Sequence, residues 1–357
     1  MDTYQPERLA LTGATGALGL AFLQRIFQDN PKLHANLLVR KESASFQAEI
    51  FQSWLAQNEK RITLIEGDMR QLGTKQFDGL VKTDGGLWHF AALTSLTAEC
   101  EEVARDIQAI NAEGTARLAE ACFKSHSSGP FYHVSTAYVV GKREGKILES
   151  ESQMNQVFRN PYETAKLAAE LSLHRAFTAG VSGAIFRPSV VVDNLGGTSG
   201  FKMVDACAYA VALAVKRQEP FVFRFKQTAN INLIHSDWVI AAMVDLARLP
   251  SGPGRTYHLT APRSTYFRDI AVILEQVAPG LKVSFEPDLQ RADLPTASKI
   301  FDKAVTEIAP YFDANIQFDR TNTERDLSPN VKETPLNLAD FVKGRLQSEM
   351  GRIAHRK

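Results

Sequence analysis

Short apolar runs and amphipathic segments alternate along the first half of the chain. The apolar runs predict strands over residues 8–11, 36–39, 61–65, 86–90, 131–134 and 182–186. Between them, apolar positions at helical spacing predict helices over residues 17–28, 46–57, 99–124 and 161–179. Strands that alternate with helices are typical of a parallel sheet covered by helices. The pattern therefore predicts an α/β fold with a doubly wound parallel sheet.

The regular alternation fades after Arg187-Pro188. A Gly-rich stretch at 194–200 is followed by a predicted helix over 204–216, a strand near 230–234 and a helix over 236–249. From Pro262 onward, short helices and loops with Pro-Gly punctuation predominate. We expect a dinucleotide-binding domain formed by residues 1–190 and about 228–262. A smaller, mostly helical substrate-binding region takes residues 191–227 and 263–357.

A glycine-rich turn stands between the first predicted strand and the first helix. Gly13, Gly16 and Gly19 are spaced G-x-x-G-x-x-G. Glycines allow a tight turn and a close approach of the backbone to a pyrophosphate, and the helix N-terminus supplies free N–H groups. This context predicts a Rossmann-type dinucleotide site. The residues expected to contact the cofactor here are Gly13, Thr15, Gly16, Ala17, Leu18 and Gly19.

The end of the second strand favours NADPH over NADH. An NAD site places a carboxylate there, which binds the ribose 2′-hydroxyl. Here Arg40-Lys41 follow the strand, and the first carboxylate is Glu42. An arginine suits a 2′-phosphate, which a carboxylate would repel. The alternative is that both cations are solvated residues at a strand end.

Tyr162 and Lys166 are the candidate catalytic pair, because they lie one turn apart on one face of a predicted helix. A nearby ammonium favours the phenolate and so lowers the tyrosine pKa from about 10. The same spacing recurs at Tyr138 and Lys142, but Gly141 predicts a loop there. Thr136, at the end of the fifth strand, is placed to hydrogen-bond a developing oxyanion.

Taken in order, these motifs resemble the extended short-chain dehydrogenase/reductases. The resemblance covers residues 8 to about 260. It rests on the glycine loop, Gly67-Asp68, His89-Phe-Ala91-Ala92, Asn111 in Asn-Ala-Glu-Gly-Thr, Ser135-Thr136 through Gly141, Tyr162-x-x-x-Lys166 and Arg187-Pro188.

The resemblance implies roles for residues that the sequence pattern alone does not assign. Asp68 would contact the adenine, and Ala91 and Ala92 would line the cofactor. Thr136 would fill the Ser/Thr position of the site, and Asn111 would support the proton relay. The expected cofactor contacts are completed by Met69, Lys166 and Pro188.

Three further segments resemble the fatty acyl-CoA reductase and thioester reductase branch: residues 89–97, 134–139 and 318–327. That branch uses NADPH to reduce an acyl thioester to an aldehyde or alcohol, with the substrate delivered by CoA or a carrier protein. Hydride would add to the thioester carbonyl, Thr136 and Tyr162 would stabilise the oxyanion, and the hemithioacetal would release the thiol.

Other functions on this scaffold remain open. One is an NADP-dependent reductase or dehydrogenase of a sterol-like or flavonoid-like substrate. Another is a nucleotide-sugar epimerase or dehydratase, which normally retains NAD; Arg40-Lys41 argues against it. Outside the enzymes, an NADP-sensing regulatory protein is the alternative, although such proteins tend to lose the Tyr/Lys pair.

Charge and composition limit the classes of binding partner that we expect. The 357 residues include 41 Lys and Arg against 40 Asp and Glu, a formal charge of +1, so no basic excess favours nucleic acid. Three scattered cysteines and the absence of a signal-like N-terminus predict a soluble, cytoplasmic protein. We expect a monomer or a homodimer. The histidines show no metal-ligand spacing, so no metal is expected.

A capped helix is predicted over residues 337–357. Its apolar positions fall near one face, and it ends in basic residues. Packing against the substrate region is the favoured interpretation. Contact with a membrane surface or an acidic partner is the alternative.

Overall fold

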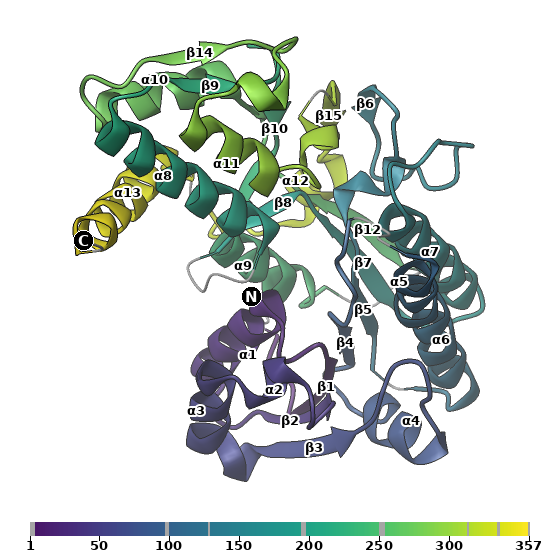
Figure 1. The fold of residues 1–357 in the computed structure, drawn as a ribbon. Coiled ribbons are helices and arrows are strands. Elements are labelled where there is room, and N and C mark those ends of the chain that lie inside the picture. The colour runs from purple at the N-terminus through teal and green to yellow at the C-terminus, as the bar shows by residue number, and fades with distance from the viewer. Residues whose placement is uncertain are drawn as a thin grey trace. The chain divides into compact units, whose positions relative to one another are not determined.

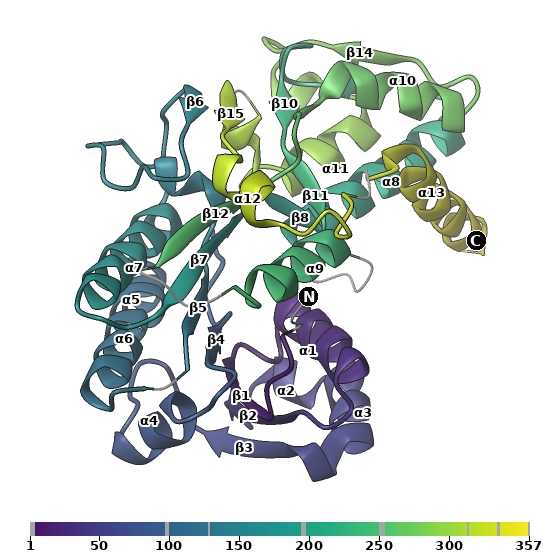
Figure 2. The same cartoon turned by 180° about the vertical axis from the view of Figure 1, so that it is seen from behind.

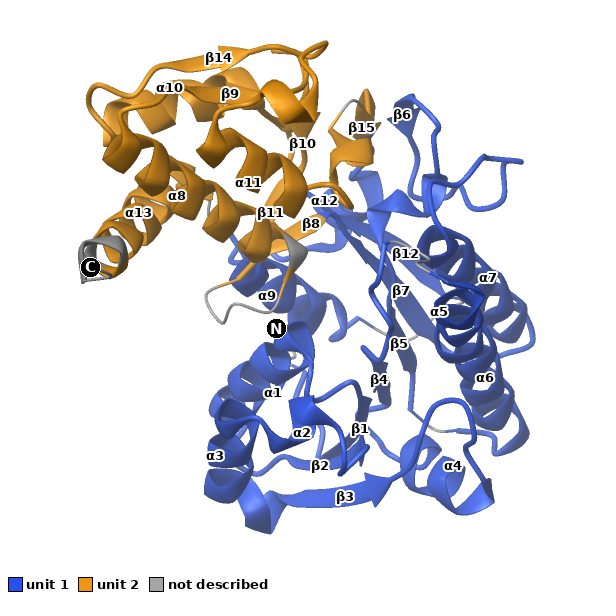
Figure 3. Ribbon diagram, in the orientation of Figure 1, with its two compact units in different colours: residues 1–189, 236–260, 318–333 blue, residues 190–235, 261–317, 334–357 orange. Residues whose placement is uncertain are grey.

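The structure is a computed structural model that describes residues 4–96, 100–127, 129–193, 198–249, 254–312, 314–333 and 336–355. Figures 1 and 2 show the course of the chain from opposite sides. The chain forms two compact units, coloured separately in Figure 3. Unit 1 contains residues 1–189, 236–260 and 318–333, and unit 2 contains residues 190–235, 261–317 and 334–357. No helix among the described residues is long and apolar enough to cross a membrane.

Unit 1 is built on a seven-stranded parallel sheet in the order β12-β7-β5-β4-β1-β2-β3. The strand order changes direction between β1 and β4, which is the switch point where open α/β sheets bind ligands. The predicted α/β fold is therefore confirmed. The strands are β1 (Arg8–Thr12), β2 (His34–Val39), β3 (Ile62–Glu66), β4 (Leu87–His89), β5 (Phe131–Val134), β7 (Gly183–Pro188) and β12 (Arg255–Leu259).

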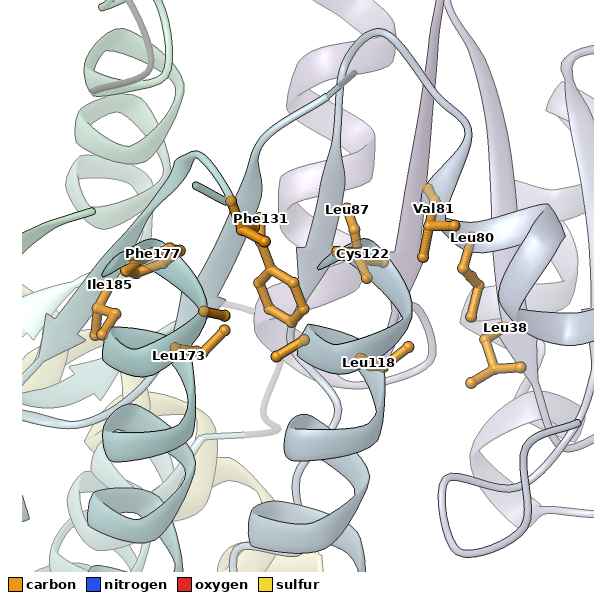
Figure 4. Packing of buried hydrophobic residues seen from close by; sticks show 14 of the residues in the cluster. Leu38, Leu80, Val81, Leu87, Leu118, Cys122, Phe131, Leu173, Phe177 and Ile185 are labelled. Carbon is orange, nitrogen blue, oxygen red and sulfur yellow. The ribbon is translucent and has the colours of Figure 1, made fainter. Parts of the chain in front are cut away.

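Helices cover both faces of this sheet. On one face, Phe22 of α1 packs on Trp88 of β4, and α1 contacts α9. On the other face, α4, α6 and α7 enclose an apolar core around Phe131 of β5 (Figure 4). The helices of unit 1 are α1 (Ala17–Asp29), α2 (Ala44–Gln47), α3 (Glu49–Asn58), α4 (Thr74–Val81), α5 (Glu101–Ile107), α6 (Gly114–Lys124), α7 (Pro161–Thr178), α9 (Ser236–Leu246) and α12 (Thr321–Asp326).

Several elements differ from the sequence prediction. The predicted helix over 46–57 is broken at Ala48, which is extended, into α2 and α3. The predicted helix over 99–124 contains the π-helix η2 (Gln108–Glu113). Helix α4 and strand β12 were not predicted, because their apolar patterns are short and interrupted by polar residues. The predicted strand over 230–234 is two short strands, β10 (Asn230–Ile231) and β11 (Leu233–His235).

Unit 2 is the smaller body and is richer in helix. Its helices are α8 (Ser199–Arg217), α10 (Phe267–Val277), α11 (Thr296–Ala304) and α13 (Leu338–His355). Three two-stranded sheets accompany them: β8 (Val190–Val192) with β11, β9 (Phe221–Phe223) with β14 (Val283–Phe285), and β10 with β13 (Thr265–Tyr266). Phenylalanine rings form much of its core, among them Phe221, Phe223, Phe225, Phe267, Phe301 and Phe312.

The remaining short elements are the 3-10 helices η1 (Glu59–Arg61), η3 (Ala137–Val140), η4 (Arg291–Asp293) and η5 (Ala309–Tyr311), and the strands β6 (Gly145–Ile147) and β15 (Ile316–Phe318). The C-terminal helix α13 packs on α8, and Arg345 pairs with Asp205 there. This packing agrees with the favoured interpretation of residues 337–357.

Two segments lie in the other unit from the one expected. Residues 228–235 belong to unit 2, and residues 318–333 belong to unit 1. The second segment is bound to the sheet by polar contacts. Asp326 accepts a hydrogen bond from Tyr257 of β12 at 2.9 Å and pairs with Arg255 at 2.8 Å. The buried Glu149 accepts the Thr323 hydroxyl at 2.7 Å. Residues 318–333 are held mainly by polar contacts and show little apolar periodicity. Their place in unit 1 could therefore not be predicted from the sequence.

A fully buried ion pair ties α7 to the sheet. Arg187 of β7 and Glu170 of α7 both have fully buried side chains, with Nη2 and Oε2 2.6 Å apart. Arg187 also donates to the carbonyl of Glu151 at 2.8 Å. Its Nη1 lies 3.3 Å from Nε2 of His258, whose Nδ1 is 2.7 Å from the Asp319 carbonyl. Since Nδ1 must donate to that carbonyl, Nε2 accepts from Arg187. Burial lowers the pKa of His258 to about 3, which agrees with a neutral ring.

Removal of one partner of this pair is expected to destabilise unit 1. Glu170→Ala leaves the Arg187 guanidinium buried without its counter-charge, which costs about 3–5 kcal/mol. Urea unfolding followed by tryptophan fluorescence measures this, because Trp54, Trp88 and Trp238 all lie in unit 1. Asp29→Ala is the control. It breaks an exposed pair with Arg25 and should cost less than about 1 kcal/mol. Equal losses in the two variants would contradict the prediction.

Candidate active site

The glycine-rich loop lies between β1 and α1, at the switch point of the sheet. Gly16 caps α1 in an extended conformation, and no side chain caps the helix. The first N–H groups of α1 are therefore available to an anion. Gly16 is exposed, whereas Thr15, Ala17 and Leu18 are partly exposed. The loop residues expected to contact the cofactor thus lie together around an open helix N-terminus.

Two of these glycines are required by close packing. Gly13 has a φ of +81°, and a Cβ there would lie 2.5 Å from the backbone nitrogen of Ala91. A Cβ on Gly19 would lie 2.2 Å from the carbonyl oxygen of Gly13. The loop is therefore folded tightly against the segment after β4, which contains Ala91 and Ala92. This cradle suits the pyrophosphate of a dinucleotide.

A directed chain of hydrogen bonds starts at this cradle. The Thr115 hydroxyl donates to the carbonyl of Asn111 at 2.6 Å, so it accepts from Nε2 of His89 at 2.8 Å. Nδ1 of His89 is then the acceptor, and the Thr12 hydroxyl donates to it at 2.6 Å. The Thr12 oxygen in turn lies 3.3 Å from the backbone nitrogen of Ala91. Burial, followed by the charge of Lys166, lowers the pKa of His89 to about 3, as a neutral ring requires.

Asn111 lies in the π-helix η2, and its side chain is hydrogen-bonded to both backbone groups of one residue. Its Oδ1 accepts from the backbone nitrogen of Leu93 at 2.8 Å, and its Nδ2 donates to the Leu93 carbonyl at 2.9 Å. The segment from Ala91 to Leu93 is therefore held at both ends. π-Helical turns are frequent at functional sites. Here the turn brings the amide of Asn111 to the backbone of Leu93.

Helix α7 carries the candidate catalytic pair. The Asn160 side chain caps it by accepting from the Glu163 nitrogen at 3.0 Å, and Pro161 occupies the first turn. Lys166 is buried, and its Nζ donates to the carbonyl of Val134 in β5 at 2.8 Å. The same Nζ lies 6.0 Å from the centre of the Tyr162 ring. The lysine thus connects the helix to the strand that ends beside Thr136.

Thr136 and the second Tyr-x-x-x-Lys copy follow β5 directly. The Thr136 hydroxyl caps η3 by accepting from the Tyr138 nitrogen at 3.2 Å, and η3 packs against α7. Gly141, with a φ of +62°, ends η3, so Tyr138 and Lys142 are not separated by a helical turn. Helical spacing therefore exists only for Tyr162 and Lys166 among these two copies.

Burial controls the protonation of the pair. It lowers the pKa of Lys166 from 10.5 to about 8, because the ammonium is held away from solvent. Burial, with repulsion from Glu163, raises the pKa of Tyr162 well above its ordinary value of 10. The expectation that the nearby ammonium lowers this pKa is therefore wrong for the free protein, because desolvation of the phenolate dominates. Tyr162 is therefore a protonated phenol in the free protein at neutral pH, ready to donate rather than to accept a proton.

The adenosine end of the predicted site gathers charged side chains. Asp68 pairs with Arg70 at 2.8 Å and lies 3.6 Å from Arg40. The hydrogen bond with Arg70 lowers the pKa of Asp68. Lys41 pairs with Glu66 at 3.1 Å. Arg70, which the sequence reasoning did not single out, is thus the main partner of Asp68.

The last predicted contacts lie at two other strand ends. Met69 is buried, and its carbonyl accepts from Arg117 of α6 at 2.6 Å. Pro188 ends β7 and is buried. No group of His, Cys, Asp or Glu that can hold a metal occurs within the described ranges.

Residues 11–243 match the family model described as male sterility protein, which spans more than half of the chain. The chain belongs to this family. The resemblance to the male-sterility-type branch of the extended short-chain dehydrogenase/reductases is thereby confirmed, and the family indicates an enzyme that uses a nicotinamide cofactor.

Curated relatives match part of the chain. The trifunctional UDP-glucose 4,6-dehydratase/UDP-4-keto-6-deoxy-D-glucose 3,5-epimerase/UDP-4-keto-L-rhamnose-reductase RHM2 of Arabidopsis thaliana is 25% identical over 47% of this chain. The match covers 25% of that relative, so this chain corresponds to about a quarter of its length.

Solved structures of two kinds share the fold. The terminal R domain of the myxalamid PKS-NRPS pathway has a TM-score of 0.72 and 21% identity, over 99% of this chain and 92% of that one. A thiolation-reductase di-domain of an archaeal non-ribosomal peptide synthetase has a TM-score of 0.71 and 16% identity, over 100% and 77%. A mutant UDP-glucuronic acid 4-epimerase of Bacillus cereus, with NAD, has a TM-score of 0.70 and 18% identity, over 97% and 99%.

The buried lysine predicts a pH dependence of stability. Because folding lowers the pKa of Lys166 from 10.5 to about 8, the unfolded chain binds more protons between these values. Stability due to this group is therefore full above pH 10.5 and is lost as the pH falls through 8. The free energy of unfolding of the wild type, relative to Lys166→Met, should rise by roughly 3 kcal/mol over this window. A constant difference from pH 8 to 10.5 in urea unfolding would contradict a buried, depressed lysine.

Proposed function

We propose that this protein is an NADPH-dependent reductase of an acyl thioester, which it converts to an aldehyde or an alcohol. The observation that carries the proposal is the attachment of Lys166 to the end of β5. This bond holds the helix that bears Tyr162 against the strand end that bears Thr136. A proton donor and a hydroxyl hydrogen-bond donor thus come from adjacent elements at the carboxyl edge of the sheet.

When bound, NADPH would supply the hydride that adds to the thioester carbonyl carbon. The hydroxyls of Thr136 and Tyr162 stabilise the oxyanion that develops. Tyr162 gives its proton to this oxygen, and the hemithioacetal then loses its thiol to yield the aldehyde. Lys166 stabilises the tyrosinate that remains, since a nearby ammonium favours the phenolate.

The acyl thioester is favoured by three segments that resemble the thioester reductase branch. The last of them, residues 318–327, is part of unit 1 and is bound to β12 and Glu149. The structural similarity to a reductase domain that is joined to a thiolation domain agrees with a carrier-bound substrate. CoA is the other carrier that this chemistry accepts.

A nucleotide-sugar epimerase or dehydratase is the second candidate. It is favoured by the curated relatives and by the similarity to an NAD-bound epimerase. Such enzymes normally retain NAD, so the charge at the end of β2 separates the two proposals. A carbonyl reductase of a sterol-like or flavonoid-like substrate would use NADP as the proposed thioester reductase does. Only a substrate assay distinguishes these two functions.

The 2′-phosphate of NADPH is assigned to Arg40. Its side chain is half exposed, and its distance of 3.6 Å from Asp68 exceeds a hydrogen bond. Asp68 is already hydrogen-bonded by Arg70 at 2.8 Å. Arg40 can therefore turn to a phosphate without leaving Asp68 unpaired. Lys41, which pairs with Glu66, is the weaker candidate.

Arg40→Glu is expected to weaken NADPH binding much more than NADH binding. The carboxylate would repel the 2′-phosphate, whereas NADH carries none there; we expect at least a tenfold change in the ratio of dissociation constants. Calorimetric titration of the free protein with each cofactor measures this. Lys60→Glu, an exposed lysine outside the proposed site, is the charge-matched control. Equal effects on the two cofactors would rule out the 2′-phosphate role.

The substrate proposal is tested by NADPH oxidation with a panel of acyl-CoAs, carrier-bound thioesters, aldehydes, ketosteroids and UDP-sugars. Turnover of thioesters is expected. Tyr162→Phe should lower kcat by about 10²–10⁴-fold, the usual contribution of a general acid, while NADPH still binds. Tyr138→Phe is the matched control and should keep its activity. No thioester turnover, with turnover of another class, would transfer the assignment to that class.

A further inference from the structure

A group of buried polar atoms beneath the catalytic helix has no hydrogen-bond partners. His133 of β5 is fully buried, and neither of its ring nitrogens is bonded to any residue within the described ranges. The hydroxyl of Ser135, two residues along, is also buried and lacks a partner there. Buried polar groups are almost always hydrogen-bonded to protein or to ordered water. Three such atoms within three residues therefore need an explanation.

These atoms face α7. Side chains alternate along a strand, so Phe131, His133 and Ser135 point to one side of the sheet. Phe131 packs with Leu173 and Phe177 of α7 in the core shown in Figure 4. His133 stacks on His89 of the neighbouring strand, with ring centres 5.2 Å apart.

Lys166 brings a charge to the same place. Its Nζ is bonded to the carbonyl of Val134, the residue between His133 and Ser135. An ammonium carries three donors, and this is the one hydrogen bond that it makes to the described residues. Two N–H groups of Lys166 thus remain beside unpartnered nitrogens and an unpartnered hydroxyl.

Two other polar side chains on the elements around Lys166 already have hydrogen-bond partners. His89 donates to Thr115 and accepts from Thr12, so both of its ring nitrogens are used. The amide of Asn111 is hydrogen-bonded to both backbone groups of Leu93, and its acceptor Oδ1 is already used by the Leu93 nitrogen. Of the buried side-chain atoms without a partner among the described residues, those of His133 and Ser135 flank Val134, the residue to which Lys166 is bonded.

We propose that an ordered water molecule binds between His133, Ser135 and the ammonium of Lys166, and that His133 positions Lys166 through this water. A buried water typically makes about three hydrogen bonds, which is the number these three groups offer. The neutral imidazole accepts from the water, and the water accepts from the ammonium. His133 is a positioning residue, because it is fully buried and would act only through the water and Lys166. Its role in catalysis rests on the proposed function, but the water site does not.

The water bridge stabilises the charged form of Lys166. Burial opposes that form, and a hydrogen bond to the ammonium favours it, so loss of the bridge should lower the lysine pKa further. The titratable and charged groups around Lys166 are Tyr162 and Glu170 on α7, His133 on β5, His89 on β4, and Arg187 on β7 through Glu170.

The test is the titration of Lys166 in the free protein. The Cε resonance of ¹³C-labelled lysine is followed with pH and assigned by its absence in Lys166→Met. His133→Leu, which removes both ring nitrogens, should lower the midpoint by about one pH unit, the size expected for a hydrogen bond to a charged group. His133→Gln restores a polar partner and should recover at least half of this shift. Phe131→Leu, on the same strand and face, is the control and should cause none.

An unchanged midpoint in His133→Leu would overturn the proposal, as would equal shifts in the Leu and Gln variants. If His133→Leu does not fold, a measurement on the wild-type protein tests the proposal instead. In ¹⁵N-histidine spectra, the acceptor nitrogen of His133 should shift as Lys166 titrates, and a constant shift would overturn the bridge. These measurements use no substrate. Failure of thioester turnover therefore leaves them interpretable, and failure of the bridge leaves the thioester assay unaffected.

Discussion

The hydrogen bond from Lys166 to the carbonyl of Val134 is the contact on which the site depends. It places a buried ammonium at the end of β5 and so fixes the first turns of α7 against the sheet. Desolvation makes such a charge costly. The helix and strand must therefore stay in register, because any movement that breaks the bond leaves the charge without its protein acceptor. Tyr162 and Thr136 take their relative position from this constraint.

A second group of buried polar side chains supports the same helix one turn further along. Glu170, one turn after Lys166 on α7, pairs with Arg187 of β7, and Arg187 continues to His258 of β12. Residues 318–333 close this network, since the carbonyl of Asp319 accepts from His258. A segment far along the chain thus stabilises the strands that flank the site.

Much of the candidate site was predictable because it depends on short-range features of the sequence. The glycine loop needs glycines at fixed spacing, and Tyr162 and Lys166 must lie one helical turn apart. Both requirements can be recognised from residues that are close together in the sequence. The choice of Tyr162 over Tyr138 also followed from a local feature, Gly141, whose positive φ ends η3. By contrast, Arg70 was missed. Its partner Asp68 is only two residues away, but its second partner Asp106, on α5, comes near only in the folded chain.

The sequence by itself determined the α/β class, the order of the first six parallel strands along the chain and the dinucleotide loop, since each depends on short-range periodicity or on the backbone freedom of glycine. Only the tertiary structure decided that β12 completes the sheet and that residues 318–333 belong to unit 1. It also decided that Asn111 binds Leu93 and that His133 is left with unused nitrogens beside Lys166. These are contacts between residues distant in sequence. Hydrogen bonds and buried charges of this kind follow no periodicity, so they appear only when the chain is folded.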